Sequence, residues 1–174
     1  MLVSAGQEAL WLAHQLDPDS AAYHVVLAVR LRDRVRTDVL QDALTALVDR
    51  HELLRSRFPA GDDGPVRRVA PPTTARLDVR EVPGADEAEL FRLADRTARE
   101  PFRLERTGAF RAVLLRRAAD DAVLVTVTHH IASDATSQWL LVRDLFAAYG
   151  ARTGGSAEPA PAAVTGWDEQ VRSE

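Results

Sequence analysis

An apolar run that leads directly into two adjacent histidines constrains this chain more than any other stretch. Residues 122–128 read AVLVTVT, and His129 and His130 follow, with Asp134 four residues further on. A β-branched run of this length is typical of a strand, and a helical pattern occupies about residues 137–149. We therefore expect a strand that ends in a turn carrying both imidazoles, with Asp134 just before a helix.

The two histidines cannot share one role, because successive side chains of a strand point in opposite directions. One ring can face a cleft, and the other has to pack or turn away. An imidazole at a strand end is a candidate general base, because its ordinary pKa lies near neutrality. By itself, however, such a pair more often packs or lies on the surface. Asp134 has three open interpretations: a helix cap, an orienting partner for an imidazole, or the partner of a buried arginine.

Composition argues against several classes of function. The net charge of −4 gives no overall footprint for nucleic-acid binding, and every basic residue is arginine. The absence of cysteine excludes disulfides and is consistent with a reducing, cytoplasmic compartment. No apolar run approaches the ~20 residues of a membrane span, and the first ten residues lack the features of a secretory signal. His14, His24 and His51 show no ligand spacing with the pair, so we expect no metal site.

The remaining segments alternate between helical and strand patterns. Ser4 and Gln7 form a capping box, and Thr37 is the expected cap of the second helix. Gly and Asp at residues 61–65 predict a hairpin turn. The predicted helices cover about residues 5–16, 37–50, 85–100 and 137–149, and the predicted strands cover 23–31, 66–69, 77–82, 110–116 and 122–128. This order predicts an α/β (α+β) fold in which helices, including the first and last, cover one face of a mixed sheet.

Composition changes after the last predicted helix. Residues 151–161 are rich in Gly, Ser, Pro and Ala, which is typical of a linker. We expect residues 1–150 to form the folded lobe and residues 151–174 to lead toward something else. Val164 and Trp167 are then expected to lack a partner within the chain.

Residues 50–58 carry several charges close to apolar residues. Arginines there are suited to the C-terminal end of the preceding helix, where they complement its dipole. Alternatively, one of them turns inward and holds a carboxylate in a bidentate pair. The residues alone favour the first interpretation.

Four blocks, in order, resemble a known family. Residues 4–11 are similar to an SxxQxxLW block, residues 50–58 to RHExLRxxF, residues 101–104 to PFDL, and residues 129–134 to HHxxxD. Each block is weak evidence alone, but the order is specific. The chain resembles the N-terminal half of a nonribosomal peptide synthetase condensation domain.

This resemblance implies a chloramphenicol-acetyltransferase-like lobe, and it also implies partners. The expected reaction is amide formation between two substrates held as thioesters on the phosphopantetheine arms of donor and acceptor carrier proteins. The domain itself binds no cofactor in this scheme. Its C-terminal lobe is absent from the sequence, and the tail around Trp167 resembles the link between the lobes.

The resemblance also assigns roles within the turn. His130 falls on the family's active histidine and His129 on its structural histidine. Asp134 falls on an aspartate that pairs with an arginine, which makes Arg55 the first-choice partner and favours the inward interpretation. The alternatives to that arginine are Arg57 and Arg50.

The sequence departs from the family pattern at three places. Ala135 replaces a glycine, which carries a cost if that position needs a positive φ or a close approach of substrate. Arg103 replaces the aspartate of PFDL. Position 129 is histidine and not aspartate, which argues against the heterocyclising branch. Ala135 favours an alternative function, a non-catalytic module that binds or recruits a carrier protein or partner enzyme.

Overall fold

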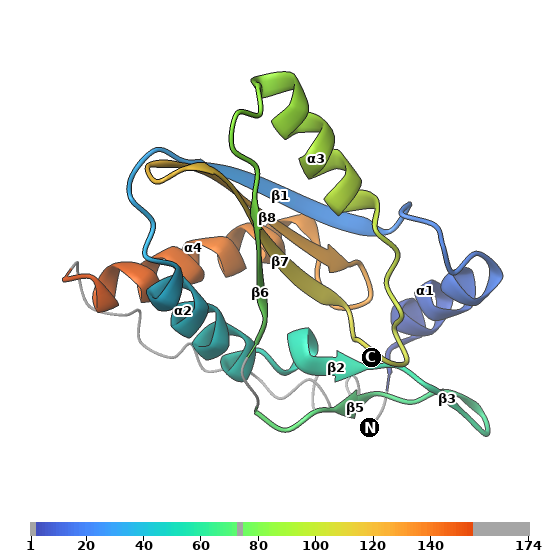
Figure 1. Ribbon diagram of the computed structural model, residues 1–174. Helices are drawn as coiled ribbons and strands as arrows, with labels where there is room; N and C mark the ends of the chain where they lie inside the picture. The colour runs from blue at the N-terminus through green and yellow to red at the C-terminus, as the bar shows by residue number, and fades with distance from the viewer. Residues whose placement is uncertain (1–2, 73–74, 155–174) are drawn as a thin grey trace.

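The structure is a computed structural model, and it describes residues 3–72 and 75–154 (Figure 1). The helices are α1 (Ala5–Leu16), α2 (Thr37–Arg50), α3 (Glu87–Arg99) and α4 (Ala135–Arg152), with a short 3₁₀ helix, η1 (Glu52–Arg55). The strands are β1 (His24–Leu31), β2 (Ser56–Arg57), β3 (Ala60–Gly61), β4 (Gly64–Pro65), β5 (Arg68–Val69), β6 (Leu77–Glu81), β7 (Phe110–Ala118) and β8 (Asp121–His129).

A four-stranded mixed sheet forms the centre of the fold. Its order is β1-β8-β7-β6, in which β8 is antiparallel to both neighbours and β6 is parallel to β7. The register places His24 opposite His129 on β1 and β8. The predicted mixed sheet is therefore confirmed, and the strand that carries the histidines is internal, with a neighbour on each side.

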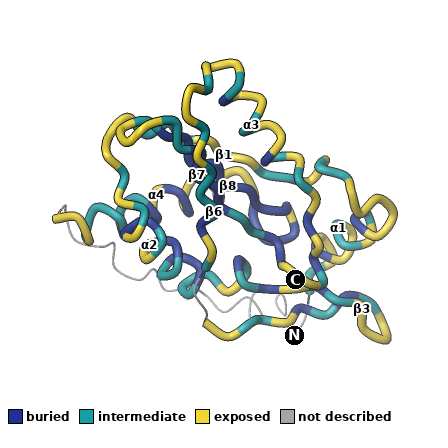
Figure 2. The backbone as a smooth tube through the Cα atoms, viewed as in Figure 1, coloured by how far each residue is buried: buried dark blue, intermediate teal, exposed yellow. Residues whose placement is uncertain are grey.

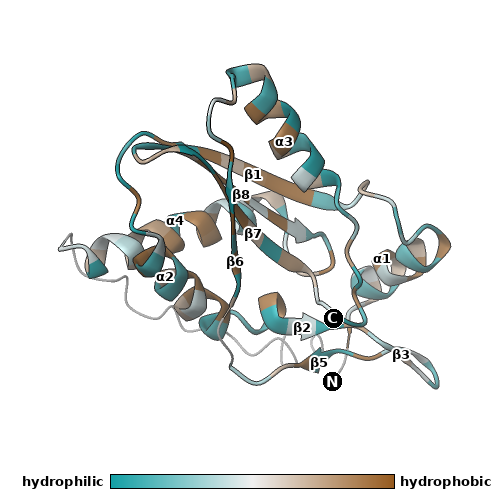
Figure 3. Cartoon of the chain, in the orientation of Figure 1, coloured by the Kyte–Doolittle hydropathy of each residue, from teal (hydrophilic) through white to brown (hydrophobic). Residues whose placement is uncertain are grey.

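Helices cover both faces of this sheet, and the expectation that they cover only one was wrong. Buried residues of α2 and α4 pack with Leu114 and Leu124 on one face, whereas α1 and α3 pack with Val113 and Val125 on the other. The reason lies in the strands themselves. In β7 and β8 the side chains that point to each face of the sheet are mostly apolar, and a strand of that kind has to be buried on both faces. Figures 2 and 3 show these strands as largely buried, with hydrophobic residues along β1 and β7.

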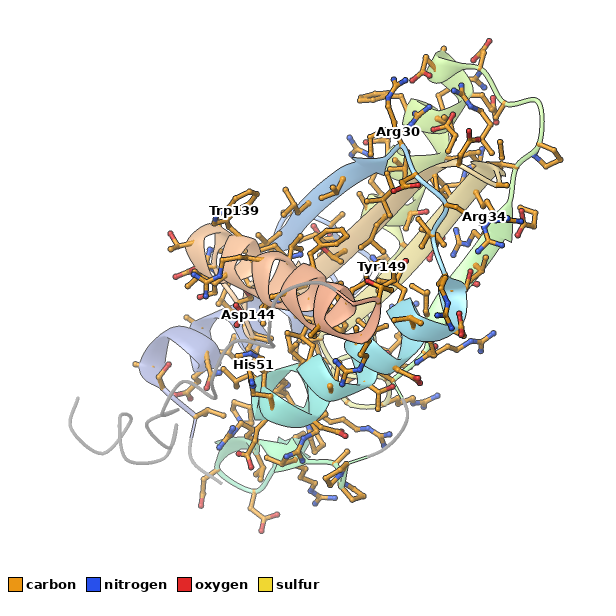
Figure 4. The ribbon with its side chains drawn as sticks, turned by 90° about the vertical axis from the view of Figure 1, so that its left-hand side faces the viewer. Arg30, Arg34, His51, Trp139, Asp144 and Tyr149 are labelled. Carbon is orange, nitrogen blue, oxygen red and sulfur yellow. The ribbon has the colours of Figure 1, made fainter. Side chains whose placement is uncertain are left out.

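The helix termini match the sequence patterns closely, with one correction. Ser4 and Gln7 form the predicted capping box at α1. Thr37 was predicted as the cap of α2, but it is the first helical residue, and Arg36 occupies the cap position without a side-chain hydrogen bond. The Arg36 backbone N–H instead donates to Tyr149 Oη at 3.0 Å, which ties the start of α2 to α4, where Figure 4 labels Tyr149.

The segment between η1 and β6 contains only short strands. The predicted turn at residues 61–65 is present as the β3–β4 hairpin. The strand expected at residues 66–69 is present only as the two residues of β5. Gly108, just before β7, has φ +82°, and a Cβ there would lie 2.9 Å from the Ser56 carbonyl oxygen. A glycine is therefore required where this segment approaches the main sheet. Val164 and Trp167 lie outside the described residues.

Candidate active site

The two histidines at the end of β8 lie in different surroundings. His129 is buried, with 2% of its surface exposed, on the face of the sheet that α1 and α3 cover. His130 is exposed. The expected divergence of the two rings is therefore present in the structure.

His129 sits among other rings and is held neutral. Its Nδ1 accepts the Ile131 backbone N–H at 3.1 Å, so the neutral ring carries its proton on Nε2. The ring of His14 lies edge-on to it at 5.7 Å between centroids, and those of His24 and Phe102 lie at 6.1 and 6.3 Å. Burial, followed by repulsion from neighbouring histidines, lowers the pKa of His129 from 6.5 to about 3. A ring in this state can shape the turn but cannot carry charge near pH 7.

His130 borders a surface hollow of about 300 Å³. The hollow lies between the first turn of α1, η1, the histidine turn and the start of α4. Its lining includes Ser4, Gln7, Leu53, Ser133 and Ser137 beside His130. An exposed imidazole beside an open hollow is available to a bound molecule, as a general base has to be.

Backbone hydrogen bonds fix the course of the chain through this turn. The His130 N–H donates to the Tyr23 carbonyl at 2.8 Å, and the Ala132 N–H donates to the His129 carbonyl at 2.9 Å. On the opposite face of β8, the Gln138 side chain bonds Thr126 and Thr128, and so joins α4 to the strand.

Gln7 was missed as a member of this site by sequence reasoning. Its Nε2 donates to the Ile131 carbonyl at 2.8 Å, across 124 positions in the sequence. The sequence signals at Gln7 were the SxxQxxLW-like block and the capping box with Ser4, and the capping box gives Gln7 a local role that already accounts for it.

The predicted ion pair between Asp134 and Arg55 is not formed. Asp134 is exposed, and its Oδ1 accepts the Ser137 backbone N–H at 2.6 Å as the cap of α4. This hydrogen bond is the main cause that lowers the pKa of the Asp134 carboxyl. Of the three interpretations of Asp134, the helix cap is correct, because the carboxylate lies at the surface and needs no buried partner.

Arg55 points toward another part of the molecule. Its guanidinium donates to the Ala70 carbonyl and lies 3.6 Å from Glu52 Oε1. It lines a separate hollow of about 470 Å³ on the far side of η1. The alternative Arg57 borders the same hollow, and neither Arg57 nor Arg50 is among the groups that lower the pKa of the Asp134 carboxyl. Arg55 is partly buried, but it does not hold a carboxylate in the bidentate pair that the inward interpretation required; it meets Glu52 and a backbone carbonyl instead.

Comparison with known proteins places this chain in a family. The condensation-domain family model matches residues 1–168. The chain belongs to the condensation-domain family. It is 40% identical over 161 residues to a probable non-canonical nonribosomal peptide synthetase of Salinispora arenicola, covering 91% of this chain and 2% of that protein. It is 37% identical over 161 residues to chondramide synthase of Chondromyces crocatus, covering 90% of this chain and 4% of that protein.

Solved condensation domains share the fold. The starter condensation domain of rhizomide synthetase superimposes with a TM-score of 0.86 at 25% identity, covering 99% of this chain and 42% of that chain. The first condensation domain of the calcium-dependent antibiotic synthetase, bound to a substrate analogue, gives a TM-score of 0.85 at 29% identity, with 99% and 44% covered. The chain therefore spans less than half of these condensation domains and corresponds to their N-terminal lobe.

The structure explains two departures from the family pattern. Ala135 is the first residue of α4, and no non-glycine residue in the described ranges has a positive φ, so this position does not need glycine conformationally. Arg103 pairs with Asp19 Oδ1 at 2.9 Å and donates to the Pro18 carbonyl at 3.1 Å. An arginine in the PFDL-like block thus holds the loop that follows α1.

Neither a metal site nor a membrane span is found in the part of the chain that the structure describes. No three His, Cys, Asp or Glu side chains there are grouped to hold a metal ion. None of the described helices has the length and apolarity to cross a bilayer.

Proposed function

We propose that this lobe contributes the histidine side of a condensation domain that forms amide bonds between a carrier-bound thioester donor and a carrier-bound aminoacyl acceptor. The observation that carries the proposal is the exposed His130 at the open hollow, beside the buried and neutral His129. Membership of the condensation-domain family supports it independently.

The proposed step is an attack on an activated carbonyl. The acceptor amine nitrogen forms a bond to the donor carbonyl carbon, the carbon–sulfur bond breaks, and the donor's phosphopantetheine leaves as a thiol. The amine loses one proton and the departing sulfur gains one. His130 either accepts the amine proton or donates a hydrogen bond to the tetrahedral intermediate. Holding both substrates in place supplies much of the rate.

Other residues of the turn have supporting roles in this proposal. His129 shapes the turn without carrying charge, and Asp134 fixes the start of α4. Arg55 supports the site only indirectly, through η1, because it does not contact the turn. The partners we propose are the donor and acceptor carrier proteins and the C-terminal lobe of the same domain. Residues 1–150 form the lobe, and residues 151–174 link it onward.

The non-catalytic alternative rested on Ala135, at a position that carries a cost if it needs a positive φ or a close approach of substrate. Ala135 begins a regular helix, which argues against the first of these two grounds. The position of His130 at the edge of the hollow supports the catalytic proposal.

The test compares amide formation by the complete condensation domain with that of its His130→Ala variant. General acid–base groups contribute roughly 10²- to 10⁴-fold, so we expect a rate loss in that range. The thermal melt is expected to stay unchanged, because the ring is exposed and only its backbone is hydrogen-bonded. Arg92→Ala, an exposed change on α3 away from the hollow, is the matched control. Full activity of His130→Ala would refute the proposed role of His130, and carrier binding without amide formation by the wild-type domain would favour the recruitment module.

A further inference from the structure

Gln7 is a buried polar side chain whose two ends are both bonded. Only 4% of its surface is exposed. Its Oε1 accepts the Ser4 backbone N–H at 3.3 Å, and its Nε2 donates to the Ile131 carbonyl at 2.8 Å. The two contacts need an acceptor at one end and a donor at the other, so they define the orientation of the amide.

The second contact is not part of helix capping. Ser4 Oγ caps α1 by accepting the Gln7 backbone N–H at 3.2 Å, and the Gln7 oxygen completes the capping box. Neither bond uses Nε2. The donation to Ile131 therefore connects α1 to the histidine turn, which lies 124 positions further along the sequence.

The Ile131 carbonyl is one of several backbone anchors around His130, and the Ala132 N–H of the same peptide group donates to the His129 carbonyl. The His130 N–H is held by Tyr23, which precedes β1, and the Ile131 N–H is held by the His129 ring. Gln7 holds the next peptide group, on the side where the chain turns toward α4. Without Nε2 this carbonyl would be a buried acceptor that lacks its side-chain donor. The backbone from which the His130 ring projects would then lose the one anchor that comes from α1, while the Ala132 N–H keeps its bond to the His129 carbonyl.

We propose that Gln7 is a positioning residue for the condensation reaction, which acts by holding the turn that presents His130 to the hollow. This inference rests on the proposed role of His130. Gln7 also lines the hollow, and so its bond lies at the site. Misplacement of a catalytic group by about 1 Å can cost roughly 10²-fold in rate, so loss of one anchor has a measurable consequence.

Gln7→Glu is the informative variant. Glutamate keeps an oxygen for the Ser4 N–H and is favoured at this capping-box position, but it cannot donate to Ile131 when ionised. Gln41→Glu is the matched control. Gln41 also joins a helix to a distant backbone: its Oε1 accepts the Leu77 N–H at 2.9 Å and its Nε2 donates to the Ala75 carbonyl.

Two readouts separate positioning from simple loss of stability. In the chain itself, NMR spectra report the ring nitrogens of His130 and the amide exchange of Ile131. In the complete condensation domain, kinetics report kcat and the apparent KM for the carrier-bound donor. For Gln7→Glu we expect shifted His130 signals, faster Ile131 exchange and a kcat lower by about 10- to 100-fold at nearly constant KM. Gln41→Glu is expected to lower the melting temperature without either change.

Equal effects of the two variants, or unchanged His130 signals in Gln7→Glu, would overturn the proposal. If Gln7→Glu does not fold, Gln7→Met replaces it, because methionine keeps the shape without the donor. If His130→Ala proves active, the proposed function fails, whereas the NMR comparison still decides whether Gln7 holds the turn.

Discussion

Acidification should destabilise this lobe through His129, well before its carboxylates titrate. The folded state holds the pKa of His129 at about 3, below the ordinary value of 6.5, chiefly because the ring is buried. Below pH 6.5 the unfolded chain therefore binds a proton that the folded chain does not. Stability from this group is complete above about pH 6.5 and is lost progressively as the pH falls toward 3.

The expected loss follows from the pH interval. Between pH 6.5 and pH 5.0 the unfolded ring gains its proton while the folded ring stays neutral. At about 1.4 kcal/mol per pH unit, this interval costs roughly 2 kcal/mol. His14 and His24, whose pKa values burial also lowers, act in the same direction. At pH 5.0 ordinary aspartates and glutamates are still ionised, so the histidines dominate the change.

Urea unfolding at pH 7.5, 6.0 and 5.0 measures this loss. His129→Asn removes the titrating ring and leaves a side-chain oxygen for the Ile131 N–H. It should be less stable than the wild type at pH 7.5, because the ring contacts are lost. Its change in unfolding free energy from pH 7.5 to 5.0 should be smaller by about 2 kcal/mol. His130→Asn, one residue further at an exposed site, is the control and should keep the wild-type dependence. A full pH dependence in His129→Asn would refute the assignment.

Two further predictions concern the start of α4. Asp134→Ala should lose about 1 kcal/mol, the usual worth of a helix cap, while Asp134→Asn should stay within a few tenths because asparagine also caps. Calorimetric melting measures both, and a loss near 3–5 kcal/mol in either would indicate a buried ion pair instead. Ala135→Gly, which introduces the residue usual in the family, should lower stability by up to about 1 kcal/mol and give no gain in amide formation by the complete domain. A clear gain in rate would show that the Ala135 methyl group obstructs the substrate.

Local patterns predicted the parts of this fold that local physics determines. The alternation in β1, the apolar runs of β7 and β8 and the capping box of α1 each depend on neighbouring residues, and each is present. The divergence of His129 and His130 follows from strand geometry alone. The covering of both sheet faces could also have been predicted from the sequence. Apart from its threonines, the run at residues 122–128 has apolar side chains at both odd and even positions, so neither face of the strand is polar.

Contacts between distant segments could not be predicted from local patterns in the same way. The choice of Arg55 as partner for Asp134 required knowing which way η1 faces, and that depends on the packing of β2 and β5. An arginine can satisfy its guanidinium with a carbonyl or a nearby glutamate, as Arg55 does with Ala70 and Glu52. Charge and sequence position therefore do not determine which pair forms.

Gln7 shows why a local explanation can hide a distant role. Its backbone N–H and its oxygen satisfy the capping box, so the pattern with Ser4 already accounts for a glutamine at this position. Glutamate would complete the box as well as glutamine does, since the cap uses only an oxygen. The amide nitrogen is the part that capping leaves unused, and it is the part that reaches Ile131. Where a residue offers more hydrogen-bonding capacity than its local motif uses, the surplus group indicates where a long-range contact should be sought.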